Sequence, residues 1–281
     1  MNEPDDVRST ARPTAQPTAL LQQARPVVAD STGRREMIAM TVVVLALIAA
    51  MEVASWFVPD YIMPSPVIVA RALGDLLMGD KSHIGITLLR LAAAVSFSMA
   101  AGILVGLAMG TFASIRPYLR SLIIIDTGIP ALSWMLVAVF WFKDPEARIF
   151  FILTVILLPF YALNVYDGMR ALPKDSVDMI ESFRPSRMQV LRFLVVPHIV
   201  PYVFLTTRSV IGYAIRMAIF AELVASAVGV GSRMSLAQST FHIDQVLAWT
   251  FFLVVLNTLF QSAVALLEKR LLRWRPEASV R

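Results

Sequence analysis

The sequence predicts an all-α polytopic membrane protein with about six transmembrane helices, and its composition and apolar runs support that class. Of the 281 residues, 57% are hydrophobic and only 16% are charged, whereas soluble domains carry about 25% charged residues. The apolar residues gather in runs that can cross a hydrocarbon core of about 30 Å, which takes about 20 helical residues. The chain has no cysteine and only three scattered histidines. We therefore expect neither thiolate chemistry nor a metal site.

The elements follow in chain order from these runs. Residues 1–33 are rich in Pro, Thr, Ala and Gln and predict a disordered tail. We expect the first span and an external loop within residues 34–84, and a short second tail at 276–281. The six predicted spans are Met37–Val58, Ile86–Phe112, Leu119–Phe142, Ala147–Tyr166, Ile199–Val228 and Val246–Glu268.

The distribution of basic residues predicts the orientation. With the N-terminus inside, 17 Lys and Arg residues lie in the inner segments, five in the outer loops, and three within or at the edge of spans. Positive charge is enriched in cytoplasmic loops of membrane proteins. We therefore expect both termini, and the loop between the fourth and fifth spans, to be cytoplasmic.

The second span carries a stripe of small residues at every fourth position. The stripe comprises Ala94, Ser98, Gly102, Gly106 and Gly110. Small residues on one helix face let another helix backbone approach closely. The neighbour is either another helix of the same chain or a second copy, and the pattern favours neither.

One segment is similar to a phosphate-binding loop but does not fit it. Residues 74–82 read GDLLMGDKS, in which Asp80 separates the second glycine from the lysine. That carboxylate would face the phosphates, and no β-strand precedes the segment. We expect no ATP binding there.

The cytoplasmic loop before the fifth span reads LPKDSVDMIESFRPSRMQVLRFLVVP and predicts two short helices. Asp175 or Ser176 can cap the first. Arg184 precedes a proline, which disfavours the α conformation and ends that helix. Ser186 can cap the second helix, Arg187–Val195. Periodicity alone is compatible with a helix pair on the inner leaflet or with a docking surface for a cytoplasmic partner.

This loop resembles the EAA loop of bacterial ABC-importer permeases, whose pattern is EAA, three residues, Gly, and about a dozen residues to Leu-Pro. Counting back from Pro197, the glycine position is Arg184 and the triplet is Asp178-Met179-Ile180. Other similar stretches are MPSP at 63–66, TLLRLAAAV at 87–95, GIPALSWM at 128–135, VFWF at 139–142, FAELVAS at 220–226 and RLLRWRP at 270–276. The chain most resembles the nitrate, sulfonate, taurine and bicarbonate type of permease.

The resemblance implies a type I ABC-importer permease fold, with a transport domain at 85–275 and coupling helices at about 174–195. It also implies a bacterial inner membrane, a homodimer, a cytoplasmic ABC ATPase that binds the ATP, and a periplasmic or lipid-anchored solute-binding protein. The chain itself is then no enzyme, needs no cofactor and binds no nucleic acid. The implied ATPase-coupling residues are Asp178, Met179, Ile180, Phe183, Arg184, Ser186 and Pro197.

Two departures from the family pattern alter the expected loop. Met179 and Ile180 replace two alanines, so we expect a matching cleft in the ATPase. Arg184-Pro185 replaces Gly-Ala, and we expect the turn to survive with altered geometry. Pro197 and Pro201 then begin the fifth span, where each lacks an N–H and should introduce a bend.

Charged residues within predicted spans are candidates for the translocation pathway, because such charges are costly unless paired or facing water. The candidates are Asp126, Arg208, Arg216 and Glu222. For Arg216 we retain two alternatives, a structural ion pair with Asp126 and direct contact with a translocated anion.

The function expected from the resemblance is a permease for a small anionic solute delivered by an external binding protein. The alternative is an ion-coupled secondary carrier, a class that usually shows internal repeats and broken midplane helices. No clear repeat is visible in this chain. An intramembrane enzyme is disfavoured, because no histidine accompanies a plausible serine nucleophile and cysteine is absent.

Overall fold

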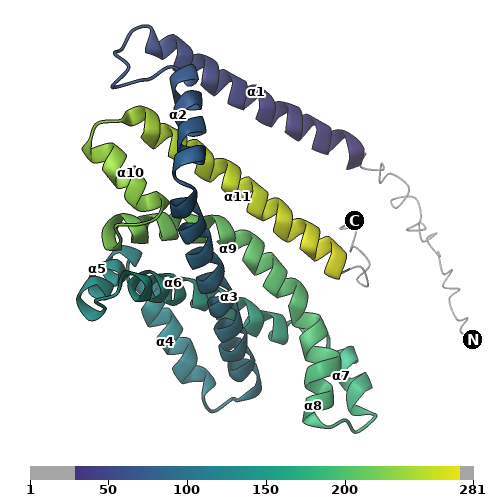
Figure 1. Ribbon diagram of the computed structural model, residues 1–281. Coiled ribbons are helices and arrows are strands. Elements are labelled where there is room, and N and C mark those ends of the chain that lie inside the picture. Colours follow the sequence, from purple (N-terminus) through teal and green to yellow (C-terminus); the bar gives the residue numbers. More distant parts are fainter. Residues whose placement is uncertain (1–28, 273–281) are drawn as a thin grey trace, which may run out of the picture. The chain divides into compact units, whose positions relative to one another are not determined.

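The computed structural model describes residues 29–272, and this part of the chain contains helices and no strand (Figure 1). The elements are α1 (Ala29–Ser55), α2 (Pro66–Gly79), α3 (Lys81–Thr111), α4 (Arg116–Gly128), α5 (Ala131–Trp141), α6 (Pro145–Arg170), α7 (Lys174–Glu181), α8 (Arg187–Val190), the π-helix η2 (Leu191–Val195), α9 (Val196–Ala225), α10 (Val230–Ser239) and α11 (Ile243–Leu271).

The chain separates after Ala50 into two compact units. The described part of the first unit is the body of α1, whose segment Ile38–Ser55 is long and apolar enough to cross a membrane. Since α1 begins at Ala29, residues 29–33 are helical, where the sequence predicts a disordered tail. The rest of that tail and the predicted tail at 276–281 lie outside the described residues.

In the described residues, five helices are long and apolar enough to span a membrane, or up to six if a bent pair counts as one span. That pair, α4 and α5, is bent by 96°. The predicted third span, Leu119–Phe142, is therefore a pair of helices with a sharp break that the sequence analysis did not predict. Its sequence explains the break, because Pro130 disfavours the α conformation of the residue before it, and Ile129 is extended with ψ 125°.

The small-residue stripe of α3 packs against α6 of the same chain. A Cβ added at Gly102 would lie 3.0 Å from the carbonyl oxygen of Leu158, and one added at Gly106 would lie 2.7 Å from that of Ala162. In lipid, helix association depends on such close packing because burying one apolar side chain against another brings little hydrophobic gain. The stripe is thus used within one copy rather than kept for a dimer contact.

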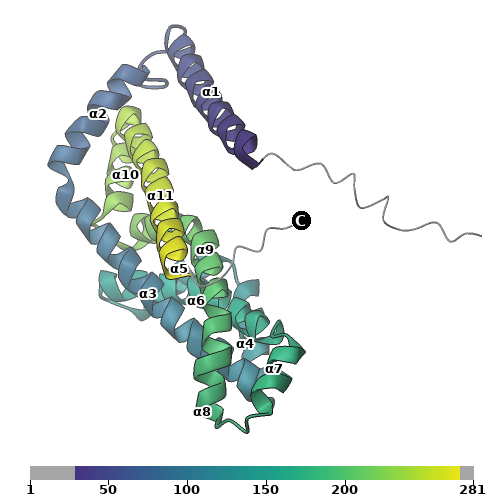
Figure 2. The same cartoon turned by 90° about the vertical axis from the view of Figure 1, so that its right-hand side faces the viewer.

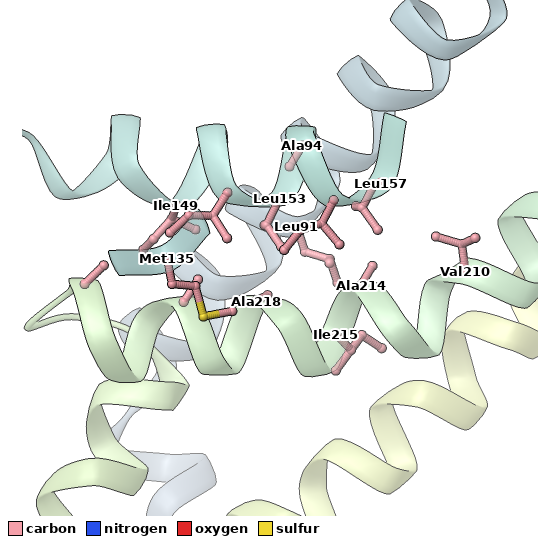
Figure 3. Packing of buried hydrophobic residues seen from close by; sticks show 14 of the residues in the cluster. Leu91, Ala94, Met135, Ile149, Leu153, Leu157, Val210, Ala214, Ile215 and Ala218 are labelled. Atoms are coloured by element: carbon pink, nitrogen blue, oxygen red, sulfur yellow. The ribbon is translucent and has the colours of Figure 1, made fainter. Parts of the chain in front are cut away.

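Apolar side chains from α3, α5, α6 and α9 form the largest buried cluster (Figure 3). Leu91 of α3 and Leu153 and Leu157 of α6 meet Ala214 and Ala218 of α9 there. The alanines let α9 lie close to α6, as small residues do in membrane helix interfaces. This core positions α9, the helix that carries Arg208, Arg216 and Glu222.

Within the second unit, short helices lie at the two ends of α9. α7 and α8 lie together at its N-terminal end, and α10 follows its C-terminal end (Figures 1 and 2). The region 34–84, predicted as the first span and an external loop, also contains α2. This helix begins with Pro66 and is capped where the Ser65 hydroxyl accepts from the Ile68 N–H at 3.5 Å. A sequence of Ser-Pro before an apolar run is a usual helix start.

Candidate functional site

The predicted coupling loop folds as α7, a tight turn and α8 (Figure 2). Asp178, Met179 and Ile180 lie on α7. The cap differs from the expected one. Pro173 stands at the N-cap with no side-chain hydrogen bond, and Asp175 and Ser176 lie inside the helix. Proline precedes the helix readily because its φ is already fixed near the helical value.

Arg184 occupies a left-handed turn. Its φ is 49°, and its N–H donates to the Glu181 carbonyl at 2.9 Å just past the end of α7. This is the backbone region that glycine enters without steric cost and that other residues rarely enter. The arginine at the glycine position therefore has a positive φ, and a turn is present there as predicted. That the geometry of the turn is altered stays a prediction.

Ser186 caps α8 as expected. Its hydroxyl accepts from the Gln189 N–H at 3.3 Å, and the Gln189 side-chain oxygen accepts from the Ser186 N–H at 2.7 Å. This reciprocal pair is a capping box, which satisfies two otherwise unpaired donors. The sequence Ser-x-x-Gln already contained that signal.

The chain stays helical from Arg187 to Ala225, so the expected separate helix Arg187–Val195 instead continues into α9. The continuation passes through η2, where the Val196 N–H donates to the Leu191 carbonyl five residues earlier. A π turn widens the backbone just before Pro197, whose ring would otherwise press on the preceding turn. Pro197 is thus accommodated by a local π-helix, whereas Pro201 lies within α9.

Large apolar side chains of this coupling loop face outward. Met179 is 64% exposed, Phe183 79% and Met188 68%. Acidic and basic side chains surround them, including Asp178 and Arg187, both of which are exposed. Contiguous exposed apolar groups with a polar rim are typical of protein interaction surfaces.

A buried ionic network joins α3, α6, α9 and α10 at the other end of α9. The Arg90 guanidinium forms ion pairs with Glu146 and with Glu222, the latter at 2.9 Å between Nη1 and Oε1. The Thr87 hydroxyl lies 2.8 Å from Oε1 of Glu222, and the Gly231 N–H donates to its Oε2 at 2.9 Å. Each buried charge thus has partners, which a low-dielectric site requires.

Two glycines make room for this network. Gly229 has φ 125° and a Cβ there would overlap the Glu222 carboxylate, while one at Gly231 would lie 2.8 Å from the Cβ of Glu222. Glu222 has no exposed surface. It therefore forms a buried ion pair in this structure, and its expected position on a pathway stays a prediction. The sequence suggested the acid but not its partner Arg90, which lies 132 residues earlier.

The other three pathway candidates lie apart. Asp126 lines a pocket with Trp134 and Thr154 where α4, α5 and α6 meet. Arg208 is exposed on α9. Arg216 lines a different groove, between α9 and α11.

The ion pair of Arg216 with Asp126, one of the two alternatives, is not formed. In residues 29–272, the three ion pairs join Arg90 to Glu146 and Glu222, and Arg233 to Asp80. The break after α4 explains the difference, because it directs Asp126 toward α5 and α6. Arg216 instead faces α11. Its groove also holds Asn257 and Gln261, which the sequence reading missed although their spacing of four on one span marks a polar helix face.

Known proteins with similar sequences are permeases. The taurine transport system permease protein TauC of Escherichia coli (strain K12) is 26% identical over 220 residues, covering 78% of this chain and 80% of TauC. The putative aliphatic sulfonates transport permease protein SsuC of Bacillus subtilis (strain 168) is 24% identical over 239 residues, covering 82% of this chain and 86% of SsuC. The nitrate import permease protein NrtB of Synechocystis sp. (strain ATCC 27184 / PCC 6803 / Kazusa) is 23% identical over 217 residues, with 73% and 79% covered.

Solved structures show the same fold. The similarity to an amino acid ABC transporter has a TM-score of 0.59 at 15% identity, covering 67% of this chain and 92% of that one. The similarity to the inward-facing MetNI methionine ABC transporter has a TM-score of 0.57 at 14% identity, with 69% and 95% covered. The fold is thus that of type I ABC-importer permeases, as expected.

A family model extends over most of the helical region, from the second half of α3 through α11. Its description is "Binding-protein-dependent transport system inner membrane component", and it matches residues 98–273. The matched part includes the coupling loop, the core helices α6 and α9, and the groove between α9 and α11. The chain belongs to this family of inner-membrane components of binding-protein-dependent transport systems.

Proposed function

We propose that this chain is the permease of an ATP-driven importer for a small oxoanion. Two copies form the pathway, a cytoplasmic ABC ATPase docks on α7 and α8, and an external binding protein delivers the solute. Both termini lie in the cytoplasm, in keeping with the 17 Lys and Arg residues of the inner segments and five of the outer loops.

The observation that carries the proposal is the exposed coupling loop within the family match. A soluble partner that covers Met179, Phe183 and Met188 would remove large apolar side chains from water, and such side chains dominate binding energy at interfaces. The loop is also stiffly connected to the membrane part, because α8 continues through η2 into α9. Movement of the docked partner would therefore be transmitted directly to α9.

The solute class is suggested by the relatives and by the charges in the spans. The permeases named for taurine, aliphatic sulfonates and nitrate all carry solutes with an anionic oxygen-rich group. In this chain Arg208 and Arg216 lie on α9. A guanidinium favours sulfonate, carboxylate and related groups through paired hydrogen bonds.

The docking assignment is tested by co-purification. We expect Phe183→Asp and Asp178→Lys to reduce recovery of the cognate ABC ATPase about tenfold or more, because a central interface contact is worth about 2 kcal/mol. The amount of inserted permease should not change, since neither residue lies in a span. Tyr61→Asp is the matched control, because Tyr61 is a 68% exposed aromatic residue outside both the coupling loop and the helices.

Retention of the ATPase and of full transport by both loop variants would show that the partner docks elsewhere. Native mass spectrometry of the same complex counts the permease copies. Two identical copies support the homodimer, whereas one copy or a second kind of permease would contradict it.

A further inference from the structure

A groove between two candidate membrane-spanning helices, α9 and α11, combines one cation with uncharged polar groups. Its volume is about 430 Å³, and its polar lining comes from Ser209 and Arg216 of α9 and from Thr250, Asn257 and Gln261 of α11. The remaining lining is apolar or glycine, and no acidic residue contributes. Small-molecule sites in proteins have volumes of about 300–1,000 Å³ and this mixture of apolar walls with few polar groups.

The Arg216 guanidinium is anchored but not neutralised. Its Nε donates to the Gly212 carbonyl at 3.1 Å. In the described part of the chain, no ion pair includes Arg216, and its terminal nitrogens have no hydrogen-bond acceptor. A guanidinium within a span is costly unless it faces water or an anion. The two terminal amino groups are therefore available to a ligand.

Asn257 and Gln261 supply a second polar wall opposite this cation. The Gln261 side-chain nitrogen donates to Oδ1 of Asn257 at 3.3 Å, which leaves the Asn257 amide N–H groups without a hydrogen-bond acceptor among residues 29–272. Asn257 lies close to α9 because of Gly212, where an added Cβ would be 2.8 Å from its Oδ1. Gly212 thus positions both walls, through its carbonyl and through its missing side chain.

We propose that this groove is an oxoanion subsite, in which Arg216 binds a sulfonate or carboxylate and Asn257 donates a further hydrogen bond. The lack of acidic residues makes the groove positive, so it disfavours cations. Arginine offers two parallel N–H groups that match two oxygens of such an anion. That the anion is the transported solute rests on the proposed function; the binding itself does not.

Binding is measured on the full chain in nanodiscs of phosphatidylcholine, by calorimetric titration with methanesulfonate. Dimethyl sulfone, its uncharged analogue of similar shape, is the control ligand. We expect the sulfonate to bind and the sulfone not to bind. Arg216→Gln should weaken sulfonate binding about 10- to 100-fold, which is the usual loss for a charge-assisted hydrogen bond. Arg216→Lys should give an intermediate affinity.

The polar wall is tested with a matched pair on α11. Asn257→Leu should weaken sulfonate binding, whereas Thr258→Val should not, because Thr258 is exposed and its hydroxyl donates to the Val254 carbonyl. Gly212→Ala should also weaken binding while leaving the charge in place. These variants keep the test valid if Arg216→Gln folds poorly. Equal binding of sulfonate and sulfone, or unchanged binding by Arg216→Gln and Asn257→Leu, would overturn the proposal.

A lipid headgroup offers the same chemistry, so a second arm uses nanodiscs with phosphatidylglycerol. Persistence of sulfonate binding there supports a solute subsite. Methanesulfonate could bind in neither nanodisc, while phosphatidylglycerol co-purifies with the wild type but not with Arg216→Gln. In that case the groove is a lipid site and the proposal is wrong.

Uptake separates this inference from the proposed function. If the wild-type complex takes up a sulfonate with ATP and Arg216→Gln does so equally well, the subsite is refuted and the importer stands. If the wild type binds methanesulfonate through Arg216 but shows no ATP-driven uptake of any tested oxoanion, the subsite stands and the importer is refuted.

Discussion

Replacing Glu222 by glutamine tests the buried ionic network most sharply. The carboxylate is completely buried, pairs with Arg90 at 2.9 Å, and meets the Thr87 hydroxyl and the Gly231 N–H at 2.8 and 2.9 Å. Glutamine has nearly the same shape, but it loses the charge and turns an NH₂ group toward donors. Breaking a buried ion pair on one side costs about 3–5 kcal/mol, which shifts the folding equilibrium more than 100-fold.

The assay is reversible unfolding in mixed micelles, followed by tryptophan fluorescence. Arg233→Gln is the control, because it breaks the pair with Asp80, in which the arginine side chain is 36% exposed. We expect a smaller loss than for Glu222→Gln, because the Arg233 side chain is partly solvated, although the Asp80 side chain is only 10% exposed. Replacing Arg90 and Glu222 together by methionine should cost less than either single change, since no unpaired buried charge remains. If Glu222→Gln costs no more than Arg233→Gln, the network does not stabilise this end of the helices.

Two further predictions concern glycine positions. Gly106→Leu should destabilise the chain by about 1–3 kcal/mol or more through overpacking against α6. Gly85→Leu on the same helix should be tolerated, because nothing lies within 4 Å of its added Cβ. The free energies of unfolding of the two variants in micelles are compared. Arg184→Val should make the α7–α8 turn about 1–2 kcal/mol less stable than Arg184→Gly does, because a β-branched residue strongly disfavours φ near 49°. Amide hydrogen exchange across the loop, without ATPase, measures this difference. Equal exchange rates in the two variants would contradict the left-handed turn at residue 184.

Local chemistry predicted those parts of the fold that depend on near neighbours in sequence. The apolar runs gave the spans, Ser186 and Gln189 gave the capping box, and the family pattern placed a turn at Arg184. The break at Pro130 was also encoded locally. We did not predict it, because the apolar run continues across the proline. Hydropathy shows that a segment is apolar, but it does not show whether the helix axis changes direction within that segment.

The partners of the membrane charges could not be predicted in the same way. Glu222 pairs with Arg90, which is 132 residues away, and Arg216 shares a groove with Asn257 of the following span. Such partners depend on how helices rotate and pack, which a single sequence does not specify. The expectation that charges in spans pair with opposite charges therefore holds for Glu222. For Arg216 it suggested Asp126, which is not its neighbour in the structure.

ATP-dependent uptake is the most direct test of the central claim that this chain is an ATP-driven importer permease. The purified chain is reconstituted into liposomes with its cognate ATPase and binding protein, and uptake of radiolabelled taurine, an alkanesulfonate and nitrate is measured with ionophores present. The account predicts that at least one oxoanion accumulates with ATP and the binding protein, and that accumulation continues when proton and sodium gradients are collapsed. Uptake that needs an ion gradient and proceeds without ATP would contradict it and identify a secondary carrier.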